Sequence, residues 1–134
     1  MKRIITVSVC SVLLAAGLVC GQEASVQSMP PSVIKTVPQS GATSVDASVT
    51  TQIAVTFSKQ MMDGSWSWCQ MSKETFPQLV GNPKYLSDKK TCLVNVKLQP
   101  KKTYVLWLNS QNFGNFKDVS GNSAVPYLLV FQTK

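Results

Sequence analysis

Apolar side chains recur at every second position along short segments of this chain, and turn residues separate those segments. In residues 51–58, for example, Ile53, Val55 and Phe57 alternate with polar or small residues. A period of two is typical of a strand with one buried face. Past the leader, no window has helical spacing over three turns. The pattern therefore predicts an all-β sandwich of about seven short strands.

The expected strands can be placed by their apolar runs and by the Gly, Pro, Asn and Asp residues between them. Residues 73–90 contain Pro77, Gly81, Asn82 and Pro83 and are predicted to be irregular. Residues 59–64 are predicted to form a turn. The strand segments are expected at 33–37, 51–58, 65–71, 92–98, 104–109 and 125–133.

The first residues have the layout of a secretory signal peptide. Lys2 and Arg3 precede an apolar run from Ile4 to Val19, and polar residues begin at Gln22. The run is shorter than the ~20 residues that span a bilayer. We expect the protein to be secreted, periplasmic or held at the cell envelope. The expected divisions are a signal peptide at 1–21, a polar linker at 22–32 and a folded domain at 33–134.

Cys20 adds an alternative to simple cleavage after Gly21. A cysteine at the end of an apolar leader resembles the lipidation site of bacterial lipoproteins, although Val19 stands where such sites have a small residue. Lipidation would anchor the protein, and cleavage would release it. In either case we expect contact with a membrane only through the signal segment or a lipid anchor.

The composition removes most kinds of catalytic and metal site. The chain has no His and only six Asp and Glu against 13 Lys and Arg. Without His, the Ser-His-Asp and Cys-His arrangements and the commonest metal ligand are missing. After cleavage the basic residues would all be scattered lysines, whereas nucleic-acid-binding proteins cluster their charge and use Arg. We expect no enzyme, no cofactor, no metal site and no nucleic-acid partner.

Several short motifs follow one another in a fixed order along residues 33–134. They are Val33-x-x-Thr36-x-Pro38-x-x-Gly41-Ala42-x-x-Val45, Ile53-x-Val55-x-Phe57-Ser58-x-x-Met61, Leu98-x-Pro100-x-x-x-Tyr104, Asp118-x-x-Gly121-Asn122 and Phe131-x-Thr133. Together they resemble the bacterial Ig-like domain of the SbsA type. The resemblance implies an immunoglobulin-like sandwich found in bacterial envelope and secreted proteins, often as a spacer or adhesion module beside other domains. This chain is expected to be a stand-alone exported copy.

Two of these motifs have a structural interpretation of their own. Leu98, Pro100 and Tyr104 have the spacing of a tyrosine corner, whose phenol packs inside while its hydroxyl bonds the backbone upstream. The segment from Asp118 through Gly121 to Asn122 is a predicted turn, since Asx side chains bond their own backbone. A calcium site would need more oxygens than this turn offers.

Trp66 and Trp68 share one face of a predicted strand. If that face is exposed, the two indoles form a platform for sugar rings, which Phe113 and Phe116 would extend. If it is buried, the indoles pack across the core of the sandwich.

Cys69 and Cys92 bear on the same question. They are expected either to form a disulfide or to remain thiols packed as small hydrophobic groups. Cys69 has the opposite parity to both tryptophans, and Cys92 is expected to face inward. A disulfide would therefore turn the indoles outward, unless a bulge intervenes, whereas buried indoles favour free thiols.

These observations support two functions. The leading one is a non-catalytic exported Ig-like module with a structural, adhesive or partner-binding role at the bacterial cell envelope. The alternative is a carbohydrate-binding module that uses Trp66 and Trp68. The expected partner is another protein or a cell-wall or surface polysaccharide.

Overall fold

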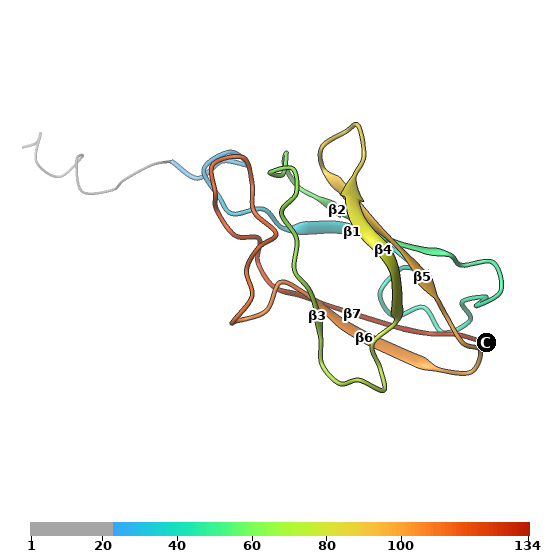
Figure 1. Cartoon of the computed structure of the whole chain (residues 1–134). Helices are drawn as coiled ribbons and strands as arrows, with labels where there is room; N and C mark the ends of the chain where they lie inside the picture. The colour runs from blue at the N-terminus through green and yellow to red at the C-terminus, as the bar shows by residue number, and fades with distance from the viewer. Residues whose placement is uncertain (1–22) are drawn as a thin grey trace, which may run out of the picture.

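Seven strands form two antiparallel sheets that pack face to face (Figure 1). The computed structural model describes residues 23–134, so the predicted signal segment and Cys20 lie outside the described residues. One sheet has the order β1-β2-β5-β4 and the other β3-β6-β7, as in a seven-stranded immunoglobulin-like sandwich. The predicted fold class is confirmed. The strands are β1 (Val33–Val37), β2 (Gln52–Phe57), β3 (Trp68–Gln70), β4 (Gln78–Tyr85), β5 (Thr91–Lys97), β6 (Thr103–Leu108) and β7 (Tyr127–Gln132).

The core lies between the sheets, and it consists mainly of the apolar side chains that recur at every second position in the sequence. The inward side chains of β2, β5, β6 and β7 are almost all buried. Phe116, which comes from the loop after β6, completes the core, and its ring centroid lies 5.0 Å from that of Phe57. No helix in residues 23–134 is long and apolar enough to cross a membrane. The buried core residues include Ile53, Val55, Phe57, Cys92, Val94, Val96, Tyr104, Leu106, Leu108, Leu129 and Phe131.

The segment 73–90, predicted to be irregular, contains a strand, so that prediction is wrong over Gln78–Tyr85. The pairing of this strand with β5 shifts register between Val80 and Lys84. The shift interrupts the alternation of apolar side chains, so the sequence pattern does not indicate a strand here. Gly81 within the shift has a φ of +72°, which glycine adopts readily. Because β4 is an edge strand, Pro83 can sit in it without breaking the sheet. Conversely, the strand expected at 65–71 is shorter than predicted and covers only Trp68–Gln70.

After β1 the chain moves from one sheet to the other. Residues 41–45 run parallel to β7 and exchange backbone hydrogen bonds with it. The N–H groups of Gly41 and Val45 donate to the carbonyls of Val130 and Gln132, at 2.7 and 3.0 Å. In return Gln132 donates to Ala42 and Lys134 to Val45, at 2.8 and 2.9 Å. This parallel contact joins an early segment of the domain to its last strand.

The described part of the predicted linker 22–32 is bonded to the domain and does not behave as a free tether. Ser58 donates its backbone N–H to the carbonyl of Ser32 at 2.8 Å, and Ser32 donates to the Ser58 hydroxyl at 2.9 Å. Val125 donates to the Pro31 carbonyl at 2.9 Å. The folded unit therefore begins before residue 33. Its two chain ends leave on opposite sides of the sandwich (Figure 1).

Tyr104 fixes the crossing from β5 to β6, which belong to different sheets. Its hydroxyl accepts a hydrogen bond of 2.7 Å from the backbone N–H of Gln99. Its buried ring stacks on Phe131, with centroids 5.4 Å apart. Leu98 packs against the core and Pro100 is exposed at the turn. This is the geometry of a tyrosine corner.

Replacing Tyr104 by Phe keeps the ring and removes the hydroxyl that Gln99 bonds. We expect the free energy of unfolding to fall by about 1 kcal/mol or somewhat more, because a partly buried N–H is left without an acceptor. Chemical denaturation of the two proteins measures this. Tyr127→Phe is a matched control, since the Tyr127 hydroxyl bonds no described residue. An equal midpoint for wild type and Tyr104→Phe would refute the role of the hydroxyl.

Candidate functional site

A lysine and an aspartate form an ion pair inside the protein. Lys59 follows β2 by two residues, and its Nζ lies 2.8 Å from Oδ2 of Asp118, with the side chains only 4% and 0% exposed. The same ammonium donates to the carbonyls of Gln27 and Met29, at 2.8 and 3.2 Å. All three ammonium protons therefore have an acceptor, as a buried lysine requires.

Asp118 is satisfied just as completely. Its Oδ1 accepts the backbone N–H groups of Ser120 and Asn122, both at 2.9 Å. Its Oδ2 accepts the Asn122 amide at 3.0 Å in addition to Lys59. Gly121, with a φ of +87°, closes the turn by donating to the Asp118 carbonyl. Asp118, Gly121 and Asn122 thus form an Asx turn, and a cation could reach the carboxylate only by displacing Lys59.

The surroundings of Asp118 set its ionisation. Burial by itself raises its pKa, but the hydrogen bonds from Lys59 and Asn122 outweigh this and hold the pKa at about 2. The carboxylate is therefore charged at any pH near neutrality. Within residues 23–134, no three His, Cys, Asp or Glu side chains come close enough to hold a metal ion.

The ion pair was not found by sequence reasoning. Lys59 was placed in a predicted turn, and Gln27 in a predicted linker. Asp118 was identified only as a turn residue. The three lie far apart in the sequence, and no local pattern marks a lysine that will be buried. The pair joins the segment before β1, the end of β2 and the loop after β6.

Breaking the pair from the lysine side should destabilise the protein strongly. Lys59→Met leaves the Asp118 charge buried without its cation, which costs about 3–5 kcal/mol. The double variant Lys59→Met/Asp118→Asn should recover part of this loss, because no charge is then buried. Urea denaturation measures both, with Lys35→Met at an exposed lysine as the control. A loss no larger than that of the control would show the pair to be unimportant.

The same pair predicts a loss of stability in acid. The folded pKa of Asp118, about 2, lies below its ordinary value of 3.8. Its contribution is thus complete above about pH 5 and disappears as the pH falls toward 2. Asp46 and Asp88 also have lowered pKa values, through hydrogen bonds from Ser48 and Thr91 respectively. Comparing the melting temperatures of wild type and Asp118→Asn between pH 6 and 2 isolates the contribution of Asp118 to the loss of stability in acid.

The advantage of wild type over Asp118→Asn should shrink steadily across that range. A difference in melting temperature that stays constant from pH 6 to pH 2 would contradict the assignment of this acid sensitivity to Asp118.

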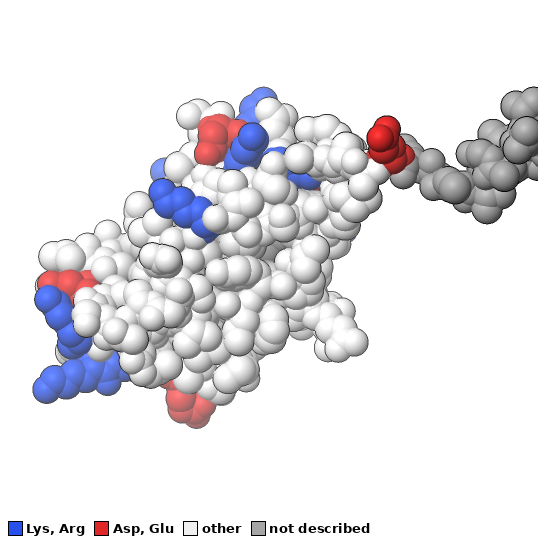
Figure 2. Space-filling model, turned by 180° about the vertical axis from the view of Figure 1, so that it is seen from behind, with Lys and Arg blue, Asp and Glu red and all other residues white. Residues whose placement is uncertain are grey.

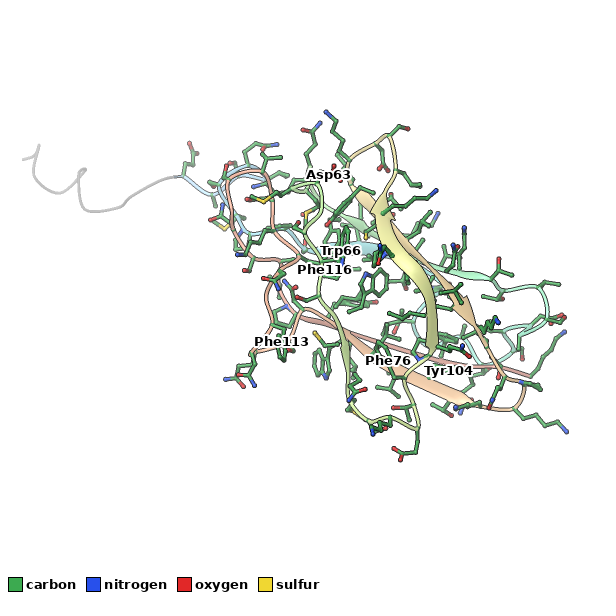
Figure 3. All side chains as sticks on the ribbon, in the orientation of Figure 1. Asp63, Trp66, Phe76, Tyr104, Phe113 and Phe116 are labelled. Atoms are coloured by element: carbon green, nitrogen blue, oxygen red, sulfur yellow. The ribbon has the colours of Figure 1, made fainter. Side chains whose placement is uncertain are left out.

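Of the two alternatives for Trp66 and Trp68, the structure has the one in which the indoles pack against the core. The Trp68 ring meets Phe116 edge-on with centroids 5.6 Å apart. Phe116, expected to extend the platform, is fully buried. Figure 3 shows Trp66 and Phe116 together between the sheets, with Phe113 apart from them. Of these aromatic side chains, Phe113 alone is well exposed, at 61%.

Cys69 and Cys92 are both free thiols in the structure, which is the alternative that accompanies inward-facing indoles. Because Trp68 faces the core, the next residue on β3, Cys69, faces the outside of its sheet. Cys92 is buried on β5 in the other sheet. Burial raises the pKa of its thiol to about 12, which the nearby indole of Trp68 offsets only in part. The buried Nε1–H of Trp68 has no hydrogen-bond acceptor among the described residues.

Two shallow grooves lie side by side where β3 meets the loop after β6. The first, of about 440 Å³, is lined by Ser67, Trp68, Cys69, Gln70, Ser110, Asn112 and Phe113. The second, of about 370 Å³, is lined by Trp107, Ser110, Gln111, Asn112 and Pro126. They share Ser110 and Asn112, and no charged side chain lines either one. Trp68, Cys69 and Phe113 are candidate residues in the sequence, but no local pattern predicts that they line one groove with the polar residues after β6.

A comparison with known protein families finds a match over most of the chain. Residues 27–133 match the family model described as a bacterial Ig-like domain. The match begins at Gln27, which is also where the segment before β1 contacts Lys59. No curated protein matches the chain significantly.

Among solved structures, the chain is similar to parts of the S-layer protein SbsC. A crystal structure of the S-layer protein rSbsC has 18% identity and a TM-score of 0.52, over 81% of this chain and 14% of that one. Domains 1–6 of surface layer protein SbsC have 19% identity and a TM-score of 0.51, over 78% of this chain and 14% of that one. The N-terminal part of SbsC has 18% identity and a TM-score of 0.52, over 81% of this chain and 24% of that one. The chain thus spans less than a quarter of each neighbour, and the likeness shows the fold alone.

Proposed function

The chain belongs to the bacterial Ig-like domain family, and from this premise we propose that it is a non-catalytic, load-bearing module of an exported protein at the bacterial cell envelope. The similarity of its fold to parts of the S-layer protein SbsC supports an envelope setting. The predicted leader 1–21, whether cleaved or lipidated at Cys20, supplies the route of export. The narrower SbsA-type assignment belongs to the same proposal.

One observation carries the mechanical part of the proposal. The parallel contact of residues 41–45 contains four backbone hydrogen bonds, three with β7 and one with Lys134 just after it. The chain ends leave on opposite sides of the sandwich, so tension would pull the early segment and the last strand in opposite directions along their length (Figure 1). Bonds that lie across the direction of pulling share the load and must break together, whereas bonds in a peeled hairpin break one at a time.

The contacts before β1 protect this arrangement. A force on the N-terminal side first meets the two carbonyls that Lys59 holds and the paired backbone bonds of Ser32 and Ser58. β1 itself is paired with β2 in antiparallel register. The load therefore reaches the parallel contact only after these anchors have given way.

The ionisable groups with the most altered pKa values have structural roles, which supports the absence of catalysis. Asp118 is occupied by four N–H donors. Cys92 is enclosed in the core. Burial raises the pKa of Tyr85, whose hydroxyl donates to the carbonyl of Ser65 at 2.6 Å. Each group is already bonded or enclosed, which is unlike the poised groups of an active site.

Single-molecule stretching between the two chain ends tests the mechanical role. Val45→Pro removes the N–H that bonds Gln132 in the parallel contact. We expect this variant to unfold at a lower force than wild type, because forced unfolding is governed by the unfolding barrier. Ile53→Val is the control, since it loosens the core without touching this contact.

The comparison is made at a temperature where the two variants have equal stability against urea. Val45→Pro should then be the weaker one under force. Equal unfolding forces for Val45→Pro and Ile53→Val would show that the parallel contact does not bear the load.

A further inference from the structure

We propose that the two joined grooves beside β3 form one binding site for a neutral glycan. We call this site the amide groove and define it by the residues that line the two grooves. The inference rests on the proposed function only in taking the cell envelope as the source of the glycan. The site itself is argued from the side chains that form it.

The outer face of the β3-β6-β7 sheet supplies the floor. Cys69 on β3 pairs with Trp107 on β6, which pairs in turn with Leu128 on β7. The neighbours of Trp107 along β6, Leu106 and Leu108, are buried in the core. Because side chains alternate along a strand, Cys69, Trp107 and Leu128 face outward, and Cys69 and Trp107 are the two that line the grooves.

Amide side chains supply the polar contacts. Gln70, Gln111 and Asn112 are exposed, and their amides bond no described residue. Each amide offers two donors and one acceptor oxygen. A sugar hydroxyl both donates and accepts hydrogen bonds. An amide therefore matches it better than an ammonium, which only donates, or a carboxylate, which only accepts.

Aromatic rings supply the apolar contacts. Phe113 stands exposed at one end of the amide groove, and half-buried Trp107 lines the other part. A sugar ring has an apolar C–H face that packs on a flat aromatic surface, while its edge carries hydroxyls. A few placed polar groups among aromatic walls are typical of small-ligand sites.

The charge pattern favours a neutral ligand. The chain has a formal net charge of +7, yet no Lys, Arg, Asp or Glu lines the amide groove. On the face seen in Figure 2, charged side chains gather in the upper part and at the lower left, and a broad area between them carries none. An acidic polymer would be attracted to the lysines elsewhere. A peptide added as a strand would find in β3 an edge only three residues long.

The amide groove is held in shape before any ligand arrives. Asn109, with a φ of +58°, donates its amide to the carbonyls of Phe116 and Ala124, both at 3.0 Å, and accepts the Phe116 N–H at 2.8 Å. Ser110 and Phe113 exchange backbone hydrogen bonds. A loop fixed in this way loses little freedom on binding, which lowers the cost of association.

The test uses the exported protein and three neutral probes: cellotetraose, maltotetraose and chitotetraose. We expect calorimetry or NMR titration to show saturable binding of at least one of them. Phe113→Ala and Asn112→Ala should each weaken it about tenfold, as loss of a central contact does. Ile34→Ala is the control, since Ile34 is 64% exposed on β1, in the other sheet, and should not change affinity.

Cys69 provides a second readout within the site. It is a free thiol that lines the amide groove, whereas Cys92 is buried. The bound saccharide should slow alkylation of Cys69 by iodoacetamide, as followed by peptide mass spectrometry. Alkylated protein should in turn bind the saccharide more weakly.

Four results would overturn the proposal, and the first three concern the glycan itself. They are no binding of any probe up to about 10 mM, binding that survives the double variant Phe113→Ala/Asn112→Ala, and binding confined to acidic polymers and lost in salt. Preference for an extended peptide over every glycan would overturn it as well. None of these results touches the unfolding force of the domain, so failure here and failure of the mechanical role are separate outcomes.

Discussion

A buried ion pair holds together the parts of this domain that the sheets leave free. Moving two charges out of water is unfavourable, and the Lys59–Asp118 pair is tolerable because every proton and both carboxylate oxygens have partners. Few other arrangements of the segment before β1 and the loop after β6 would satisfy all of them. The pair therefore defines one geometry for three segments that share no strand.

The regular part of the fold could be predicted from the sequence because it rests on a local rule. Alternation placed β1, β2, β5, β6 and β7 to within a residue or two. It could not show β4, whose register shift around Gly81 interrupts the period. Nor could it show the ion pair, because the burial of Lys59 depends on Gln27 and Asp118, far from it in the chain.

The site shows the same division. The alternation of side chains along β3 correctly predicts that Trp68 and Cys69 face opposite sides of the sheet. Trp68 packs against the core, Cys69 faces outward, and the two cysteines form no disulfide. The alternation alone could not show which face of β3 packs against the core. Phe116 decides it, by filling the core from a loop that has no period of its own. The aromatic rings left for the outer face are then Trp107 and Phe113, which the strand pattern of residues 65–71 does not involve.

The irregular edge of the larger sheet matters beyond the fold. β4 leaves one side of its backbone unpaired, and a straight, apolar edge of that kind tends to recruit strands from neighbouring molecules. The kink at Gly81, the missing N–H of Pro83 and the charge of Lys84 spoil this edge as a template. Many copies could therefore crowd together on a surface without fusing into a continuous fibrous sheet.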